Sequence, residues 1–262
     1  IAHRDGWLLG TGTDGKVLRL DAKGNLSTFF QAPEAQVFAL FSDADGTVFA
    51  GTSPSGKVYR VSADGSSSAE FFTPGETYIW ALDRGRDGRL LVATGTQGKL
   101  YSVDSGGKGK VILDVADPHL RTLAPMADGS VLVGTAGEGL VLRLAANGKV
   151  HTLYDAPQPE IVALTAGPDG TFYAAALASE ASQVDLATPS SSSGSESSSG
   201  TDKSKSDESS DSSGESSSFD GTGTRPSSFK GWRSEVLSIL PSGSVETLYG
   251  FQEETVYSLL WS

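Results

Sequence analysis

The sequence feature that most constrains the fold is an Asp-Gly pair that returns at a nearly constant interval. The successive copies are 40 to 42 residues apart and begin at Asp5, Asp45, Asp87, Asp128 and Asp169. A unit of this length cannot bury its apolar residues alone and must pack against its neighbours. The interval therefore predicts a repeat architecture with one supersecondary motif in each unit.

Within each unit, short apolar or alternating runs are separated by Gly, Asp, Asn and Pro, which is typical of strands joined by tight turns. The second unit shows four such runs, at 37–40, 48–51, 57–61 and 69–72. This pattern predicts an all-β fold, a β-propeller of four-stranded antiparallel blades. We expect one domain over 1–262, with repeats at about 1–40, 41–82, 83–123, 124–164 and 165–259.

Two positions keep the same kind of side chain from unit to unit. The second strand has a small residue, which would let adjacent blades approach closely, at Gly10, Gly51, Ala93, Gly134 and Ala175. The first strand has a leucine at Leu40, Leu82, Leu123, Leu164 and Leu259. Because Leu259 falls in the first strand of what looks like a further unit, at 256–261, the sequence predicts an excerpt of a longer chain whose ring has six to eight blades.

The fifth unit is interrupted by a low-complexity insertion at 187–229. Its centre, residues 190–218, contains 17 serines, six acids and two lysines, and no apolar residue. Such a segment cannot bury enough surface to offset the entropy lost on ordering, so we expect it to be disordered. We interpret it as a solvating spacer whose deletion the fold would tolerate.

Charge and composition exclude several classes of protein. With 32 acidic and 20 basic residues the formal charge is -12, which disfavours nucleic acid as a partner. The chain has no cysteine, so it forms neither disulfides nor thiolate metal sites. No apolar run is long enough to span a membrane.

Two short motifs resemble ligand loops but are better explained as turns. The segment 10–17 nearly matches a phosphate-binding loop, yet it recurs at 51–58 and 93–100, each time between two predicted strands and without the helix that such a loop requires. Residues 43–46 resemble the start of a calcium loop, but the downstream bidentate Glu is missing. The sequence predicts no metal ligands and no catalytic residues, and it does not indicate a cofactor.

Two further sets of positions are candidates for binding. An acidic rim is predicted in the loops that precede the first strands, at Glu34, Glu76, Asp117 and Glu253, with Gln158 at the same position in the fifth unit. Further along these strands, polar and aromatic residues combine in a way that suits a ligand pocket, although packing between blades, with Arg121 paired to an acid, is the simpler explanation. The candidate ligand-binding residues are Tyr78, Trp80, His119, Arg121 and Glu160, while Phe38 and Val162 take the place of Trp80 and Arg121 in other units.

The repeated combination of an inner strand, an Asp-Gly turn and strands such as 48–52 and 57–61 resembles bacterial β-propeller repeats of the NHL and two-component-regulator-propeller type. The resemblance covers the chain outside the insertion. It implies a propeller and an extracytoplasmic location, periplasmic or secreted. Similarity to gluconolactonase-type propellers is weaker, because their metal-binding residues have no counterpart here.

These observations favour a binding or interaction scaffold over an enzyme. The ligand, a protein, a peptide or a small molecule, is unknown. Two alternatives remain at this point: a metal-dependent hydrolase or lactonase with its site in the axial channel, and the sensor ectodomain of a larger signalling protein. Carboxylates or histidines that converge on the axis would favour the enzyme.

Overall fold

The computed structural model describes residues 1–167, 169–178, 232–240 and 242–260. The insertion predicted at 187–229 lies outside these residues. All described strand pairs are antiparallel, and the described residues contain no helix. The predicted all-β class is therefore confirmed.

The strands form five groups of four, each ordered as in the sequence. The first two groups are β1 (Ala2–His3), β2 (Gly6–Gly10), β3 (Lys16–Asp21) and β4 (Leu26–Gln31), then β5 (Gln36–Ser42), β6 (Val48–Ser53), β7 (Val58–Val61) and β8 (Ser68–Phe72). The third and fourth are β9 (Tyr78–Arg84), β10 (Leu90–Gly95), β11 (Lys99–Val103) and β12 (Gly109–Asp114), then β13 (His119–Pro125), β14 (Val131–Ala136), β15 (Leu140–Leu144) and β16 (Val150–Asp155). The fifth is β17 (Glu160–Ala166), β18 (Phe172–Leu177), β19 (Ser234–Ile239) and β20 (Val245–Phe251).

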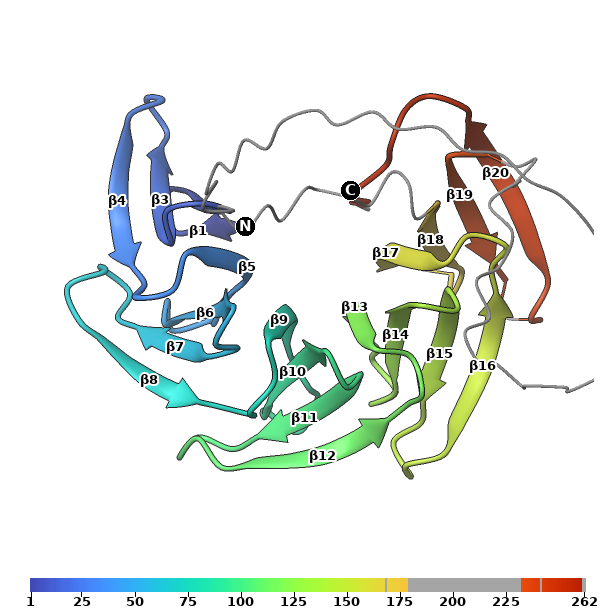
Figure 1. The fold of residues 1–262 in the computed structure, drawn as a ribbon, viewed down its shortest axis with the longest axis horizontal. Coiled ribbons are helices and arrows are strands. Elements are labelled where there is room, and N and C mark those ends of the chain that lie inside the picture. The colour runs from blue at the N-terminus through green and yellow to red at the C-terminus, as the bar shows by residue number, and fades with distance from the viewer. Residues whose placement is uncertain (168, 179–231, 241, 261–262) are drawn as a thin grey trace, which may run out of the picture. The chain divides into compact units, whose positions relative to one another are not determined.

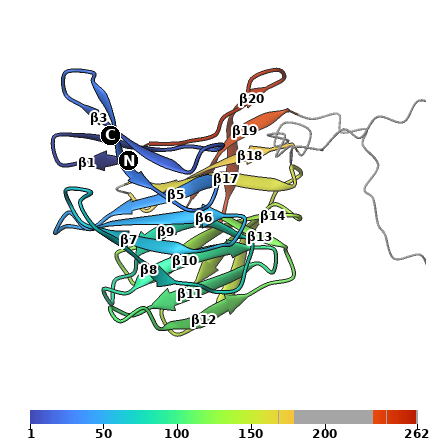
Figure 2. The ribbon, with the colours of Figure 1, turned by 60° about the vertical axis from the view of Figure 1, so that its left-hand side comes forward.

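The first strand of each complete blade lies innermost and the fourth outermost (Figure 1). The inner strands contact one another in chain order, β5 with β9, β9 with β13 and β13 with β17. Figure 2 shows the sheet of β5–β8 and the sheet of β9–β12 lying in successive layers. Single bridges, Gly95 to His119 and Ala136 to Glu160, also join the last three blades. This radial order of strands is the one that the repeat predicts.

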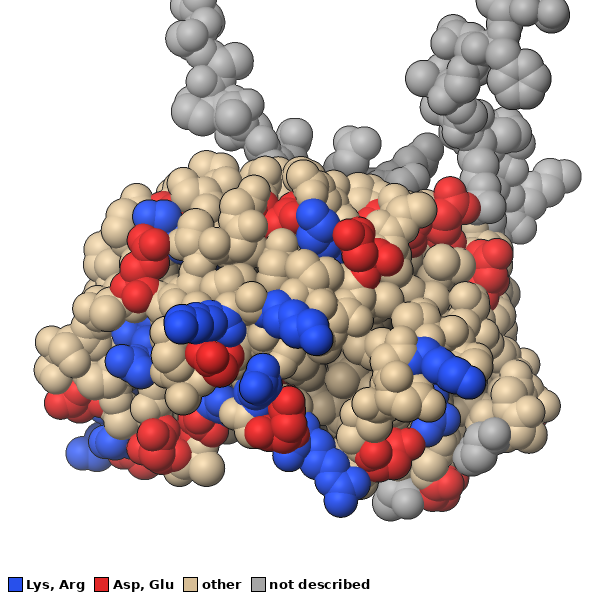
Figure 3. All heavy atoms as spheres, turned by 90° about the horizontal axis from the view of Figure 1, so that it is seen from below, with Lys and Arg blue, Asp and Glu red and all other residues tan. Residues whose placement is uncertain are grey.

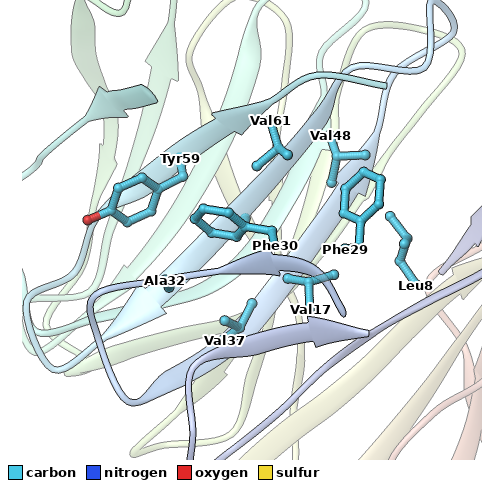
Figure 4. Packing of buried hydrophobic residues seen from close by; sticks show 10 residues of the cluster. Leu8, Val17, Phe29, Phe30, Ala32, Val37, Val48, Tyr59 and Val61 are labelled. Atoms are coloured by element: carbon cyan, nitrogen blue, oxygen red, sulfur yellow. The ribbon is translucent and has the colours of Figure 1, made fainter. Parts of the chain in front are cut away.

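The hydrophobic core is divided among the interfaces between neighbouring blades. Between the first two blades, for example, Val17 and Phe30 pack with Val37 and Tyr59 (Figure 4). Three similar clusters fill the next three interfaces. Each blade is therefore stabilised mainly by the blade next to it, as expected for repeats that cannot form a core alone.

The small position of the second strand is required by this packing. A Cβ added to Gly51 of β6 would lie 2.4 Å from Cγ2 of Ile79 on the inner strand of the next blade. A Cβ on Gly134 would lie 2.7 Å from Cγ2 of Ile161, one interface further along. The prediction that smallness here allows blades to approach is confirmed.

The motifs resembling ligand loops are turns. Residues 10–17, 51–58 and 93–100 each connect two antiparallel strands, so the hairpin interpretation is confirmed. In the loop that resembles a calcium site, the carboxylate of Asp45 accepts a hydrogen bond from the backbone N–H of Thr47 at 2.8 Å, and Asp43 pairs with Arg84.

Of the predicted strand at 256–261, the described residues 256–260 form no strand, since 252–260 belong to none. Strand formation needs backbone partners, but the backbone N–H of Val256 donates instead to the side-chain Oγ of Ser234 at 3.3 Å. Tyr257 and Leu260 are exposed. In the first blade, the short strand β1 pairs with the start of β2 through Ala2 and His3.

Candidate functional site

The inner strands β9, β13 and β17 bring the five candidate ligand-binding residues together. Tyr78 and Trp80 lie two residues apart on β9, and their rings stack with centroids 4.7 Å apart. From β13, Nδ1 of His119 accepts a hydrogen bond of 3.1 Å from Nε1 of Trp80, and the guanidinium carbon of Arg121 lies 4.0 Å from the centroid of a Trp80 ring. From β17, Oε2 of Glu160 lies 3.9 Å from Nε of Arg121.

Four inner strands contain a β-bulge at the same position. On β9, Ile79 is opposite Thr94 and Ala81 is opposite Ala93, so that Trp80 between them has no partner on β10. The same irregularity leaves an unpaired residue in β5, β13 and β17. We call these four residues the bulge row: Phe38, Trp80, Arg121 and Val162. Bulges commonly redirect a side chain beside a functional site.

The bulge row lines a cavity of about 540 Å³. This volume is within the usual range for a small-molecule pocket. Within the row, the rings of Phe38 and Trp80 lie 5.0 Å apart, and Arg121 covers Trp80. The other lining residues come from the same strands and from three further segments, namely Ile1, Leu8, Leu9, Gly10, Val37, Ala39, Leu40, Ala81, Leu82, Thr122 and Ser258. Tyr78, His119 and Glu160 are not among them; Tyr78 and His119 contact Trp80, and Glu160 lies 3.9 Å from Arg121.

Electrostatics favour a neutral imidazole beside a cation. Burial, and then the positive charge of Arg121, lower the pKa of His119, while the charge of Glu160 opposes this shift. Because Nδ1 accepts the indole N–H, the neutral ring carries its proton on Nε2. Burial also lowers the pKa of Arg121, but a guanidinium remains charged in a protein. The cluster therefore contains one fixed cation.

The residues of the predicted acidic rim are placed differently from one another. Glu34, Glu76 and Asp117 are buried, as is Gln158, whereas Glu253 is exposed. The carboxylate of Glu76 accepts hydrogen bonds from the backbone N–H groups of Thr96 and Gln97, both at 3.1 Å. This arrangement differs from the solvent-facing rim that the sequence suggests.

The burial of these residues follows from where they lie, in the loop that connects the last strand of one blade to the first strand of the next. We call each such connection, at Glu34, Glu76, Asp117 and Gln158, a joint. Their backbone carbonyl oxygens lie against glycines of the preceding blade: a Cβ added to Gly56 would be 1.9 Å from the carbonyl oxygen of Glu76. The side chains instead reach their own blade, where the hydroxyl of Tyr59 donates to Glu34 at 3.1 Å. Burial, then this hydrogen bond, raises the pKa of Tyr59 to about 12. Each joint is thus held by a backbone contact with the preceding blade and by a side-chain contact with the following one.

Sequence reasoning missed three features of this region. Phe38 and Val162 occupy the position of Trp80 and Arg121 in the repeat, but neither looks like a ligand contact by residue type. A buried carboxylate on β19, Glu235, accepts a hydrogen bond of 2.9 Å from Gln158. The repeat position did identify Phe38 and Val162, but their apolar side chains kept them from being proposed as ligand contacts. The partner of Gln158 is 77 residues away in sequence, and no local signal indicates it.

A second cavity, of about 470 Å³, lies between the third and fourth blades. Arg86, Asp87, Asp128 and Ala146 are among the residues that line it. On the side of the molecule seen from below, acidic and basic side chains are interspersed (Figure 3). In the part of the chain that the structure describes, no three His, Asp or Glu side chains gather in a group that could hold a metal ion, and no helix has the length and apolarity needed to cross a membrane.

No protein-family model and no curated protein sequence matches the chain. Solved structures do match. A streptogramin B lyase is 13% identical with a TM-score of 0.60, over 93% of this chain and 64% of the lyase. Regucalcin from Agrobacterium tumefaciens, described as a calcium-binding protein, is 18% identical with a TM-score of 0.54, over 66% of this chain and 65% of regucalcin.

The extracellular domain of a hybrid two-component system from B. thetaiotaomicron is 15% identical with a TM-score of 0.54, over 65% of this chain and 24% of that protein. The chain thus spans slightly less than two thirds of the length of the lyase and of regucalcin. At these identities the likeness concerns the fold alone. All three are β-propeller proteins, and this chain has the fold of a β-propeller repeat protein.

Proposed function

We propose that the chain is a non-enzymatic binding scaffold whose ligand site is the cavity lined by the bulge row. The observation that carries this proposal is the repeated bulge, which places Phe38, Trp80, Arg121 and Val162 around one cavity. A row of redirected side chains around a cavity is a common way to build a site.

The polar groups of the cluster support binding more than catalysis. One nitrogen of His119 is already occupied by Trp80, and Arg121 is held between Trp80 and Glu160. Such fixed groups orient a ligand at little entropic cost. The likeness to a two-component extracellular domain makes a sensor ectodomain a specific form of this proposal. An extracytoplasmic location is part of that form.

The proposal can be tested by filling each cavity in turn. A library of small neutral and charged aromatic fragments would be screened against the wild-type chain by ligand-observed NMR. Val162→Trp fills the cavity of the bulge row, and Ala146→Trp, the matched control, fills the second cavity. We expect fragments that bind the wild type to be lost in Val162→Trp and retained in Ala146→Trp.

Two results would contradict the proposal. One is a wild-type chain that binds no fragment at all. The other is fragment binding that survives in Val162→Trp but disappears in Ala146→Trp. Circular dichroism and melting curves would show that both variants are folded, so that a lost signal reports the cavity and not the fold.

A further inference from the structure

We propose that the cavity of the bulge row takes a small organic anion with an apolar body, and that Arg121 binds its carboxylate or an equivalent acidic group. This inference rests on the proposed function, because it concerns the ligand of the same site. It begins from the charge of the lining. Among the described residues that line the cavity, Arg121 carries the only ionisable side chain, and none is Asp or Glu.

The second step is the state of the Arg121 guanidinium. Its Nε is buried, and no hydrogen-bond acceptor among the described residues is within reach of it. The carboxylate of Glu160 is at 3.9 Å from this nitrogen, which is an ion-pair distance and too long for a hydrogen bond. Arg121 therefore has a buried N–H donor without a hydrogen-bond partner in the part of the chain that the structure describes, and a carboxylate of a ligand could accept from it.

The third step is that the guanidinium is already held in place. Trp80 covers one face of it at 4.0 Å, and Tyr78 and His119 in turn fix the indole. A cation over an aromatic ring in a partly desolvated site is stabilised by the ring. Glu160 lies on the side of Nε and does not line the cavity, so it balances the buried charge without occupying the ligand space.

The rest of the lining defines the body of the ligand. Phe38, Leu40, Leu82 and Val162 present apolar surface around Arg121. Binding would remove this surface from water together with an apolar group of the ligand. A cationic ligand would instead meet Arg121 without a carboxylate in the lining to offset it. The geometry thus points to an amphipathic anion.

The test compares two probes of nearly the same shape, phenylacetate and the neutral phenylacetamide, by isothermal titration. We expect the wild type to bind phenylacetate about tenfold more tightly, since hydrogen bonds to a charged group are worth more than neutral ones. Arg121→Met keeps the apolar stem over Trp80 and removes the donors. It should weaken phenylacetate about tenfold and leave phenylacetamide within roughly twofold.

Two further variants complete the design. Arg121→Lys keeps a charge without the planar fork and should retain part of the preference for phenylacetate. Arg86→Met, in the second cavity, should change neither affinity. Equal affinities of the wild type for both probes, or an equal loss of both in Arg121→Met, would overturn the anion inference and leave the binding site intact. If neither probe binds the wild type while other fragments of the library still do, the anion inference fails and the proposed function stands; if no fragment binds, both fail.

Discussion

Replacing Glu76 by Ala tests whether the buried acids fix the joints between blades. Its carboxylate accepts two backbone hydrogen bonds, from Thr96 and Gln97, and the side chain is buried. Hydrogen bonds to a charged group contribute about 1.5–3 kcal/mol each to the free energy of unfolding. Because Thr96 and Gln97 are exposed, water can replace part of this bonding in the variant. We therefore expect Glu76→Ala to lower the free energy of unfolding by about 2–3 kcal/mol.

Two variants make this measurement specific. Glu76→Gln keeps an oxygen acceptor and loses the charge, so its cost should be about 1 kcal/mol. Glu253→Ala changes the same repeat position where the side chain is exposed, and should stay within about 0.5 kcal/mol of the wild type. Urea unfolding followed by circular dichroism measures all three. If Glu76→Ala costs no more than Glu253→Ala, the acids do not fix the joints and our reasoning is refuted.

Two other predictions concern packing and pH. Gly51→Ala places a Cβ 2.4 Å from Ile79 and should cost about 1–3 kcal/mol in urea unfolding, whereas Gly12→Ala, which meets nothing within 4 Å, should be nearly neutral; equal costs would contradict the close approach. The folded pKa of His119 is below its unfolded value of 6.5, so the unfolded chain binds more protons and stability should fall as the pH drops through 6.5. Melting curves should show a weaker pH dependence in His119→Asn, and an unchanged dependence would contradict the assignment.

The fold could be predicted from sequence because its signals are local and repeated. The turn at Asp45 and Gly46 and the alternation of the flanking strands are each weak evidence, but the same pattern recurs in every unit. Repetition also identified the small position at Gly51, since a role in packing between blades must be met at each interface. The prediction of a last strand at 256–261 was wrong because a strand also needs a partner for its backbone hydrogen bonds, and an alternating sequence pattern does not show whether one is present.

The candidate site was predicted only in part. The grouping of Tyr78, Trp80 and Arg121 follows from repeat positions, because equivalent residues of neighbouring inner strands must lie side by side. The bulge at Trp80 does not follow, since an unpaired residue is a property of two strands and not of one sequence. Nor could the burial of Glu76 be foreseen, because it depends on how closely its carbonyl oxygen approaches Gly56 of the preceding blade.

The buried acids and the bulge row belong to one arrangement. In the third blade Glu76 comes four residues before Trp80, and in the fourth Asp117 comes four residues before Arg121. Each acid is fixed at a joint by its carbonyl oxygen and its carboxylate, and it therefore sets where the following inner strand begins. In each of these blades the bulged residue comes four residues after the acid, and its side chain lines the cavity. Because the buried acids fix where each inner strand begins, the bulged residue can differ between blades, from Phe38 to Arg121. We propose that the combination of these residues determines which ligand the cavity accepts.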